Sequence, residues 1–118
     1  MISVPPHDPG KVARARHHIA RVEAHDGLDR VQDVLCDPAR LRIIAALDGM
    51  ELTVSDLAAA IGRKVPATSQ HLRRLREGVL VERERRGPTV YYRLHPGPAI
   101  EQLQAMLTAL EQPPSVAG

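Results

Sequence analysis

The feature that most constrains the fold is the order of patterns across residues 53–94. Two short helical patterns are separated by a turn, and two strand-like segments follow, separated by Arg86-Gly87-Pro88. Helix, turn, helix and then hairpin is the order of a helix-turn-helix followed by a β-ribbon. The sequence therefore predicts a winged helix-turn-helix, a mainly α fold with a β-hairpin wing.

The first of these two helices has ends that can be recognised in the sequence. Thr53-Val54-Ser55-Asp56 fits a capping box, in which the Thr hydroxyl accepts from the amide three residues on and the Asp carboxylate reaches back to the cap amide. Leu57, Ala58 and Ile61 form its apolar side, and Gly62 stands where a left-handed C-terminal residue is needed. We expect a short helix with one buried side.

The second helix is expected to begin near Pro66, because a first helical turn has no partner for the amide that proline lacks. At 100° per residue, the side predicted to face the core collects Val65, Thr68, Leu72, Leu75 and Val79. The opposite side carries amide, guanidinium and hydroxyl groups, which pair with base edges and phosphates in a major groove. This face is predicted to contact double-stranded DNA, through Lys64, Ala67, Thr68, Ser69, Gln70, His71, Arg73, Arg74 and, from the hairpin, Arg86.

Positive charge is concentrated in the same part of the chain. Residues 63–86 hold eight Lys or Arg against three Glu, a balance of +5, whereas the whole chain carries only +2. An excess confined to one helix and one hairpin indicates a polyanionic partner. With two Tyr, no Phe and no Trp, the chain lacks the stacking platforms that single-strand and RNA binders use.

The hairpin is predicted from two segments rich in β-formers, residues 80–85 and 89–94. Arg85 and Arg86 fall at its tip, where they could reach a phosphate or an adjacent minor groove. Tyr91 and Tyr92 are expected to pack beneath it.

The remaining core pattern predicts a helical body for this head. Asp37 suits a helix cap and Pro38 a first helical turn, and an apolar stripe of Leu28, Val31 and Leu35 marks the helix before it. The 118 residues suit one domain over residues 10–111, with flexible tails at 1–9 and 112–118 that are rich in Pro, Gly and Ser. The absence of a long apolar run or a signal peptide, and a single cysteine, predict a cytoplasmic protein.

Four motifs together resemble the bacterial ArsR/SmtB family of transcriptional regulators. They are Leu-Cys-Asp-Pro-Ala-Arg-Leu-Arg-Ile-Ile at 35–44, Leu-Thr-Val-Ser-Asp-Leu-Ala at 52–58, Ala-Thr-Ser-Gln-His-Leu-Arg-Arg-Leu at 67–75 and Val-Tyr-Tyr-Arg-Leu at 90–94. The resemblance extends over about residues 28–110. It implies a homodimer that binds palindromic operator DNA and releases it when a metal or another small inducer binds.

The two terminal helices carry matched apolar stripes. Because the winged head does not need them for its own core, we expect them to pack across a two-fold axis in a homodimer, although packing within one subunit is the alternative. Such a dimer would place two recognition helices one DNA turn apart. The predicted interface is Val12, Ala15, Ile19 and Val22 with Ile100, Leu103, Leu107 and Leu110.

The signal that such a regulator would sense is less constrained. The resemblance implies a Cys-x-Cys pair in arsenic, cadmium and lead sensors, but the matching positions here are Thr53 and Ser55. It also implies Asp, His and Glu ligands on the last helix of zinc and cobalt sensors, but residues 96–111 contain no His or Asp. Neither ligand set is present.

Histidines in the N-terminal helix leave a different metal open. Imidazole suits nickel, cobalt or zinc, so His17, His18 and His25 are the candidate ligands, with nickel first and zinc or cobalt next. On one helix His18 and His25 would stand about 10 Å apart, so a second segment or subunit would have to complete the site. Solvated or interfacial histidines are the alternative.

Two single residues and two other function classes complete the analysis. His71 is interpreted as a DNA-contacting or packing group, and Cys36 as an inert core thiol with a redox sensor as the alternative. No phosphate loop, nucleophile elbow or two-His metal helix is present, so an enzyme is not expected. The alternatives to metal sensing are a regulator of the same family that responds to a non-metal or redox signal, and a winged-helix module that binds proteins.

Overall fold

The computed structural model describes residues 7–25 and 27–111. Within them the chain forms six helices and a two-stranded antiparallel sheet in the order expected of a winged helix-turn-helix. The elements are α1 (Pro9–Glu23), α2 (Leu28–Leu35), α3 (Pro38–Ala46), α4 (Val54–Ile61), α5 (Val65–Glu77), β1 (Val81–Arg86), β2 (Thr89–Leu94) and α6 (Pro98–Glu111). Residues 1–6 of the predicted tail at 1–9, and the predicted tail at 112–118, lie outside the described residues; α1 begins at Pro9, inside the predicted tail, with Asp8 as its cap.

One apolar core holds all elements except α1. Helix α4 packs on α3 and α5, the first strand packs against α5, and α6 packs against α2. Ile43 and Ile44 of α3, Leu57 of α4 and Leu72 and Leu75 of α5 are each at most 1% exposed. Burial of these side chains from several helices fixes the direction of α5, whose other side faces solvent.

The predicted start of α3 and both predicted ends of α4 are confirmed. Thr53 Oγ1 accepts a hydrogen bond from the Asp56 amide at 3.2 Å, although the reciprocal bond from the Thr53 amide to the Asp56 carboxylate is not formed, and Gly62 adopts the left-handed conformation with φ 69°. Asp37 caps α3 by accepting from the Ala39 amide at 2.9 Å, and Pro38 occupies the first turn. These local interactions fix where α3 and α4 begin and where α4 ends.

The C-terminal end of α5 differs from the prediction. Val79 was expected on the core side of the helix, but α5 ends at Glu77 and Val79 is 46% exposed with φ 58°. Its amide donates to the Arg76 carbonyl at 2.9 Å, and the Leu80 amide donates to the Leu75 carbonyl at 2.9 Å. This pair of bonds is a Schellman motif, which reverses the chain and returns Leu80 to the core.

The wing is a six-residue antiparallel pair in which Val81 lies opposite Leu94 and Arg86 lies opposite Thr89. Arg86 therefore belongs to the strand, and the turn consists of Gly87, at φ 62°, and Pro88. Tyr92 is 9% exposed and exchanges backbone hydrogen bonds with Leu52, so it packs beneath the wing as predicted. Tyr91 is half-buried, with the Arg86 guanidinium 4.9 Å above its ring.

Four predicted packing positions are wrong. In α2 the fully buried residue is Val34, whereas Leu35 is 46% exposed. In α6 Ile100 and Leu103 are 3% and 1% exposed inside the core of their own chain, so the predicted stripe is not one surface. Cys36 is exposed, not a core thiol, because it follows the last turn of α2 and caps it from outside the core.

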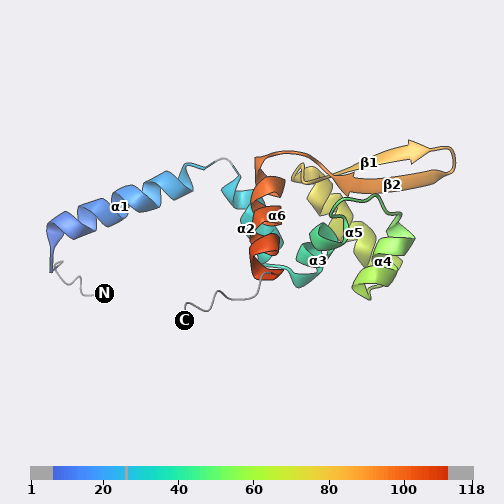
Figure 1. Ribbon diagram of the computed structural model, residues 1–118, viewed down its shortest axis with the longest axis horizontal. Coiled ribbons are helices and arrows are strands. Elements are labelled where there is room, and N and C mark those ends of the chain that lie inside the picture. Colours follow the sequence, from blue (N-terminus) through green and yellow to red (C-terminus); the bar gives the residue numbers. More distant parts are fainter. Residues whose placement is uncertain (1–6, 26, 112–118) are drawn as a thin grey trace, which may run out of the picture.

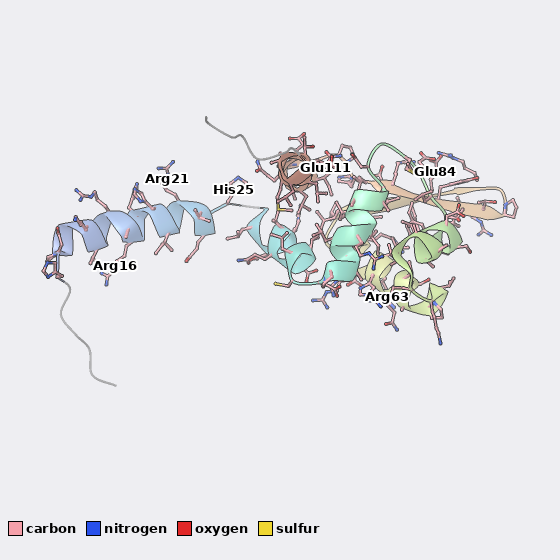
Figure 2. All side chains as sticks on the ribbon, turned by 60° about the horizontal axis from the view of Figure 1, so that its bottom comes forward. Arg16, Arg21, His25, Arg63, Glu84 and Glu111 are labelled. Carbon is pink, nitrogen blue, oxygen red and sulfur yellow. The ribbon has the colours of Figure 1, made fainter. Side chains whose placement is uncertain are left out.

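Helix α1 extends away from the body toward the end opposite the wing (Figure 1). None of its residues is buried, and the chain measures 63 × 44 × 26 Å along its principal axes. Arg16 projects from α1 with no part of the body beside it (Figure 2), whereas Arg21, one turn nearer the body, lines a cavity together with residues of α2 and α6. Across residues 7–25 and 27–111, no helix has the length and apolar character needed to cross a membrane.

Candidate nucleic-acid interface

The outward side of α5 is the centre of the candidate interface. Ser69, Gln70, Arg73 and Arg74 are exposed, and Ala67 is half-buried between them. The buried side of the same helix consists of Thr68, Leu72 and Leu75. The 100° periodicity thus separates Thr68, Leu72 and Leu75 from the polar side as predicted, but Val65, also expected to face the core, is 42% exposed in the first turn of α5.

Thr68 is not available for DNA contact. The residue is fully buried, and its Oγ1 donates to the Lys64 carbonyl at 3.0 Å inside the helix. Its hydroxyl therefore has a partner within the chain, which is how a buried polar group avoids its desolvation cost. Lys64 is exposed at the cap position of α5 and keeps its place at the surface.

The two arginines of α5 differ in their acidic partners. Arg73 pairs with Glu77 one turn along the same helix at 3.4 Å, with the two side chains 80% and 68% exposed. Arg74 instead turns toward α2, where its Nε and Nη2 lie 3.4 and 3.3 Å from the two carboxylate oxygens of Asp33. Arg74 therefore contacts a second helix, α2, whereas the acidic partner of Arg73 lies on α5 itself.

Asp33 belongs to a charged cluster between α2, α3 and α5. Arg40 donates to its carboxylate at 2.8 Å and to its backbone carbonyl at 3.1 Å. The hydrogen bond from Arg74, opposed by some desolvation and aided by Arg40, lowers the pKa of Asp33. The carboxylate is thus ionised at neutral pH. His71 lies on the edge of this cluster, its Nδ1 3.8 Å from the Asp37 carboxylate and its side chain 23% exposed.

The face of the wing that carries Arg93 holds a second charged network. Arg93 donates to Glu82 and Glu84, each at 2.6 Å, and Glu82 also contacts the His95 ring at 2.9 Å. The hydrogen bond to His95 and then that to Arg93 lower the pKa of Glu82. The Arg86 and Arg93 hydrogen bonds likewise lower the pKa of Glu84.

Arg86 belongs to this network and is not a free cation at the wing tip. Its guanidinium contacts Glu51 at 2.7 Å and Glu84 at 2.9 Å, and these carboxylates raise the pKa of Arg86. Arg86 in turn is the main cause of the lowered pKa of Glu51. Its role as a phosphate contact stays a prediction, in which DNA would have to compete with these two carboxylates; the other exposed arginines of β1 are Arg83 and Arg85.

An open groove of about 980 Å³ separates α5 from the wing. Ser69, Arg73 and Arg76 line it from α5, and Arg83 lines it from β1. Arg76 and Arg83 are not among the DNA contacts predicted from the sequence, although both belong to the basic segment, residues 63–86, that indicated a DNA partner. Glu77, Glu82 and His95 also line the groove, so its charge is mixed.

The candidate metal ligands lie at the other end of the molecule. His18 and His25 line a cavity of about 510 Å³ between α1, α2 and the start of α6, together with Val22, Val31 and Ala99. His17 is not among the lining residues; its ring centroid is 6.5 Å from that of His18. No group of three or more His, Cys, Asp or Glu with metal-binding geometry occurs in the described part of the chain. The described residues of one chain therefore bring two imidazoles to this cavity and form no complete metal-ligand set.

Neither charged cluster was predicted from the sequence. The wing network has a sequence signal, because the hairpin register sets Glu82 opposite Arg93. The pairing of Asp33 with Arg74 spans 41 residues between two helices, and no local pattern indicates it.

Comparisons with known proteins agree with this geometry. The model of the bacterial regulatory protein arsR family matches residues 37–83. The chain is 39% identical over 61 residues to the HTH-type transcriptional regulator KmtR of Mycobacterium tuberculosis, a match covering 52% of this chain and 47% of KmtR. It is 31% identical to the biofilm growth-associated repressor of Xylella fastidiosa over 79% of this chain and 84% of that repressor.

A solved structure extends the likeness to the fold. The homodimeric winged helix-turn-helix DNA-binding domain Mb0332 of Mycobacterium bovis, described as a possible ArsR-family regulator, matches with a TM-score of 0.64 and 25% identity. The match covers 92% of this chain and 91% of that domain. These proteins are named as regulators, repressors or DNA-binding domains and not as enzymes. The chain belongs to the ArsR/SmtB family of bacterial regulatory proteins.

Proposed function

We propose that this protein is a homodimeric transcriptional regulator that binds a palindromic operator through α5 and the groove beside the wing. The observation that carries the proposal is the exposed polar side of α5, where Ser69, Gln70 and Arg73 stand outward from a core that fixes the helix. An amide at the centre of such a face can pair bidentately with adenine, and the flanking guanidinium groups suit guanine or phosphate. Binding of operator DNA by a transcriptional regulator fits the cytoplasmic location expected from the sequence.

The groove supports different roles for α5 and the wing, with base recognition by α5 and phosphate binding in the groove. Arg76 and Arg83 approach it from α5 and from β1, so a phosphate backbone seated there would meet cations from both elements. Phosphate contacts of this kind fix register without reading sequence. Gln70 is therefore assigned to base recognition and Arg83 to backbone binding.

The homodimer is supported by apolar surface that one chain leaves uncovered. Ile19 and Val22 on α1 are 54% and 58% exposed, and Leu110 on α6 is 72% exposed. The proposed interface consists of the predicted stripe on α1 with Leu107 and Leu110 of α6. Ile100 and Leu103 support it from the core beneath.

The test is a binding titration with the full-length protein. A duplex selected from a random pool by the wild type is compared with a scrambled duplex of the same composition. Gln70→Ala is expected to lower affinity for the selected duplex by about five- to a hundredfold and to leave the scrambled duplex nearly unchanged. Gln32→Ala, an exposed amide of α2 that lines neither the groove nor the histidine cavity, is the matched control and should change neither.

Arg83→Ala tests the backbone side of the proposal. It should weaken both duplexes by a similar factor and reduce the slope of log affinity against log salt by about 1. If Gln70→Ala and Arg83→Ala both bind the two duplexes as the wild type does, α5 and the wing are not the interface.

A second candidate function is a response to a divalent metal. One observation favours it: His18 and His25 line the same cavity next to the surface left for the second subunit. Imidazoles suit nickel, zinc or cobalt, and a second subunit could supply the missing ligands. Calorimetry with nickel chloride should show weaker binding for a His18→Ala/His25→Ala variant than for His17→Ala, which removes a histidine outside the cavity. Equal affinity of all three proteins would favour a non-metal inducer.

A further inference from the structure

The contact between Arg74 and Asp33 uses one particular edge of the guanidinium. Nε and Nη2 of Arg74 face the two carboxylate oxygens at 3.4 and 3.3 Å. Within residues 7–25 and 27–111, no hydrogen-bond partner lies on Nη1 of Arg74. The side chain is 61% exposed even though it is paired. Arg74 is therefore oriented from one side while the end of its guanidinium stays open to solvent.

Asp33 is itself fixed independently of Arg74. Arg40, whose side chain is only 15% exposed, holds the Asp33 carboxylate at 2.8 Å and the Asp33 carbonyl at 3.1 Å. Arg40 also lies 3.7 Å from Asp37, the cap of α3. The carboxylate that meets Arg74 is thus anchored to two helices of the body, and its position does not depend on the recognition helix.

A guanidinium held in this way has two properties that an unpaired one lacks. Its positive charge is partly offset by the Asp33 carboxylate, which it shares with Arg40, and this weakens its attraction to phosphates of any sequence. Its remaining N–H groups are still donors in a fixed plane, as hydrogen bonding to the O6 and N7 acceptors of guanine requires. Pairing therefore reduces sequence-independent binding more than base recognition.

We propose that Asp33 is a specificity-determining positioning residue, which orients Arg74 toward a guanine edge and withholds its charge from DNA phosphates. The proposal rests on the proposed function, because it needs α5 to lie in the major groove. It extends the function by assigning a role in sequence discrimination to a residue of α2 that does not contact DNA itself.

Arg73 provides the internal comparison for this inference. It lies next to Arg74 on α5 and also pairs with an acid, Glu77, but both side chains of that pair are largely exposed and belong to the same helix. An exposed pair of this kind is weak and does not fix either side chain. Arg73 is therefore expected to act on phosphates, and loss of its partner should affect all DNA sequences alike.

The experiment compares Asp33→Asn with Glu77→Gln, two changes that each remove one negative charge beside an arginine of α5. Affinities are measured for the selected and the scrambled duplex over a range of salt concentrations. For Asp33→Asn we expect tighter binding of the scrambled duplex, a salt slope steeper by about 1 on that duplex, and a fall of at least about fivefold in the ratio of the two affinities. For Glu77→Gln both affinities should rise by the same factor and their ratio should stay constant.

A second variant keeps the inference testable if Asp33→Asn loses stability through Arg40. Arg74→Lys leaves the pair of Asp33 and Arg40 intact and retains the positive charge, but it cannot present a planar pair of donors. It should lose affinity for the selected duplex and bind the scrambled one within about twofold of wild type. A duplex selected again by Arg74→Lys should lose one guanine preference per half-site.

The outcomes separate this inference from the proposed function. Suppose that Gln70→Ala reduces discrimination between the selected and scrambled duplexes. If Arg74→Lys preserves that discrimination, the proposed role of Asp33 is wrong and the proposed interface stands. The same conclusion follows if folded Asp33→Asn behaves like Glu77→Gln. If Gln70→Ala preserves discrimination as well, the assignment of α5 as the reading helix fails first. A lower ratio for Arg74→Lys, and for Asp33→Asn where folded, with an unchanged ratio for Glu77→Gln, supports the inference.

Discussion

The head of the molecule, the segment from α3 to β2, and its N-terminal helix α1 differ in how many of their side chains are buried. The segment from α3 to β2 buries side chains from three helices and a hairpin, and several of them have no exposed surface at all. Helix α1, although longer than α5, has no buried residue and contributes nothing to that core. Both segments have an apolar stripe, so the stripe alone does not determine where a helix packs.

The difference shows what each region needs to be stable. The head provides partners for its own apolar residues, and the exposed side of α5 is therefore free to be polar. The stripe of α1 has no such partners within one chain, and exposed apolar surface of this kind marks an interaction site. We therefore expect the head to respond to substitutions independently of protein concentration, and α1 to respond through association.

The largest effect is expected in the head. Leu75→Ala removes a fully buried side chain of α5 and should lower the free energy of unfolding by about 2–5 kcal/mol, because it loses apolar burial and leaves a cavity. Denaturant titration at two protein concentrations measures it. Leu110→Ala at the exposed end of α6 is the control and should change intrinsic stability much less. Equal losses for the two variants would contradict the assignment of the core.

The next effect tests whether α1 associates with a second copy. Ile19→Asp places a charge on the exposed stripe and should shift the protein from dimer to monomer, because burying that charge in an apolar interface costs several kcal/mol. Size exclusion with light scattering gives the mass. Ala13→Asp adds the same charge on another side of α1 and should leave the dimer intact. A monomeric wild type, or an Ile19→Asp dimer of unchanged affinity, would contradict this use of the helix.

A smaller effect is expected where the head itself is strained. Val79 holds φ 58° at the end of α5, a conformation that a β-branched residue rarely adopts. Val79→Gly should raise the free energy of unfolding by about 1 kcal/mol, since glycine adopts this φ without a Cβ clash and Val79 is not in the core. Thermal and denaturant unfolding measure the change. Val79→Ala, which retains a Cβ, should gain much less, and a loss of stability in Val79→Gly would show that relief of strain does not outweigh the entropy glycine loses on folding.

The parts of the fold that the sequence predicts are those with local causes. Thr53, Gly62 and Asp37 act within a few residues of themselves, so their roles could be predicted without the tertiary structure. The periodicity of α5 also separated Gln70 from Leu72 correctly. For the candidate site, this was enough to predict the polar side of the recognition helix.

The parts that the sequence did not predict depend on contacts between distant segments. Thr68 was assigned to both sides of α5, and only the packing of that helix on α3 and α4 shows that it is buried. Ile100 and Leu103 shared a stripe with Leu110, but the contact with α2 covers only one end of α6. Arg86 was predicted at a free tip because the sequence does not fix the end of the strand to within one residue. Its position as the last residue of β1 brings it next to its acidic partners.

The smallest effect concerns this wing network and its response to pH. The pKa values of Glu82, Glu84 and Glu51 are all lowered, chiefly by hydrogen bonds from His95 to Glu82 and from Arg86 to Glu84 and Glu51. A carboxylate whose pKa is lower in the folded state stabilises the protein above its ordinary pKa of about 4 and loses that contribution as pH falls through the folded value. Stability should therefore be constant from pH 7 to 5 with respect to these groups and should decline below about pH 4.

Glu82→Gln tests the origin of this decline. The variant lacks one of the lowered pKa values, so its unfolding midpoint should fall less steeply between about pH 4 and 2 than that of the wild type. Glu111→Gln, an exposed change at the end of α6, is the control and should follow the wild-type curve. Because the network is partly exposed, added salt should reduce the difference between Glu82→Gln and wild type. A Glu82→Gln curve parallel to that of the wild type would show that groups outside the wing cause the loss of stability in acid. The carboxylate of Asp33, which is paired with Arg40, would then be the next group to replace.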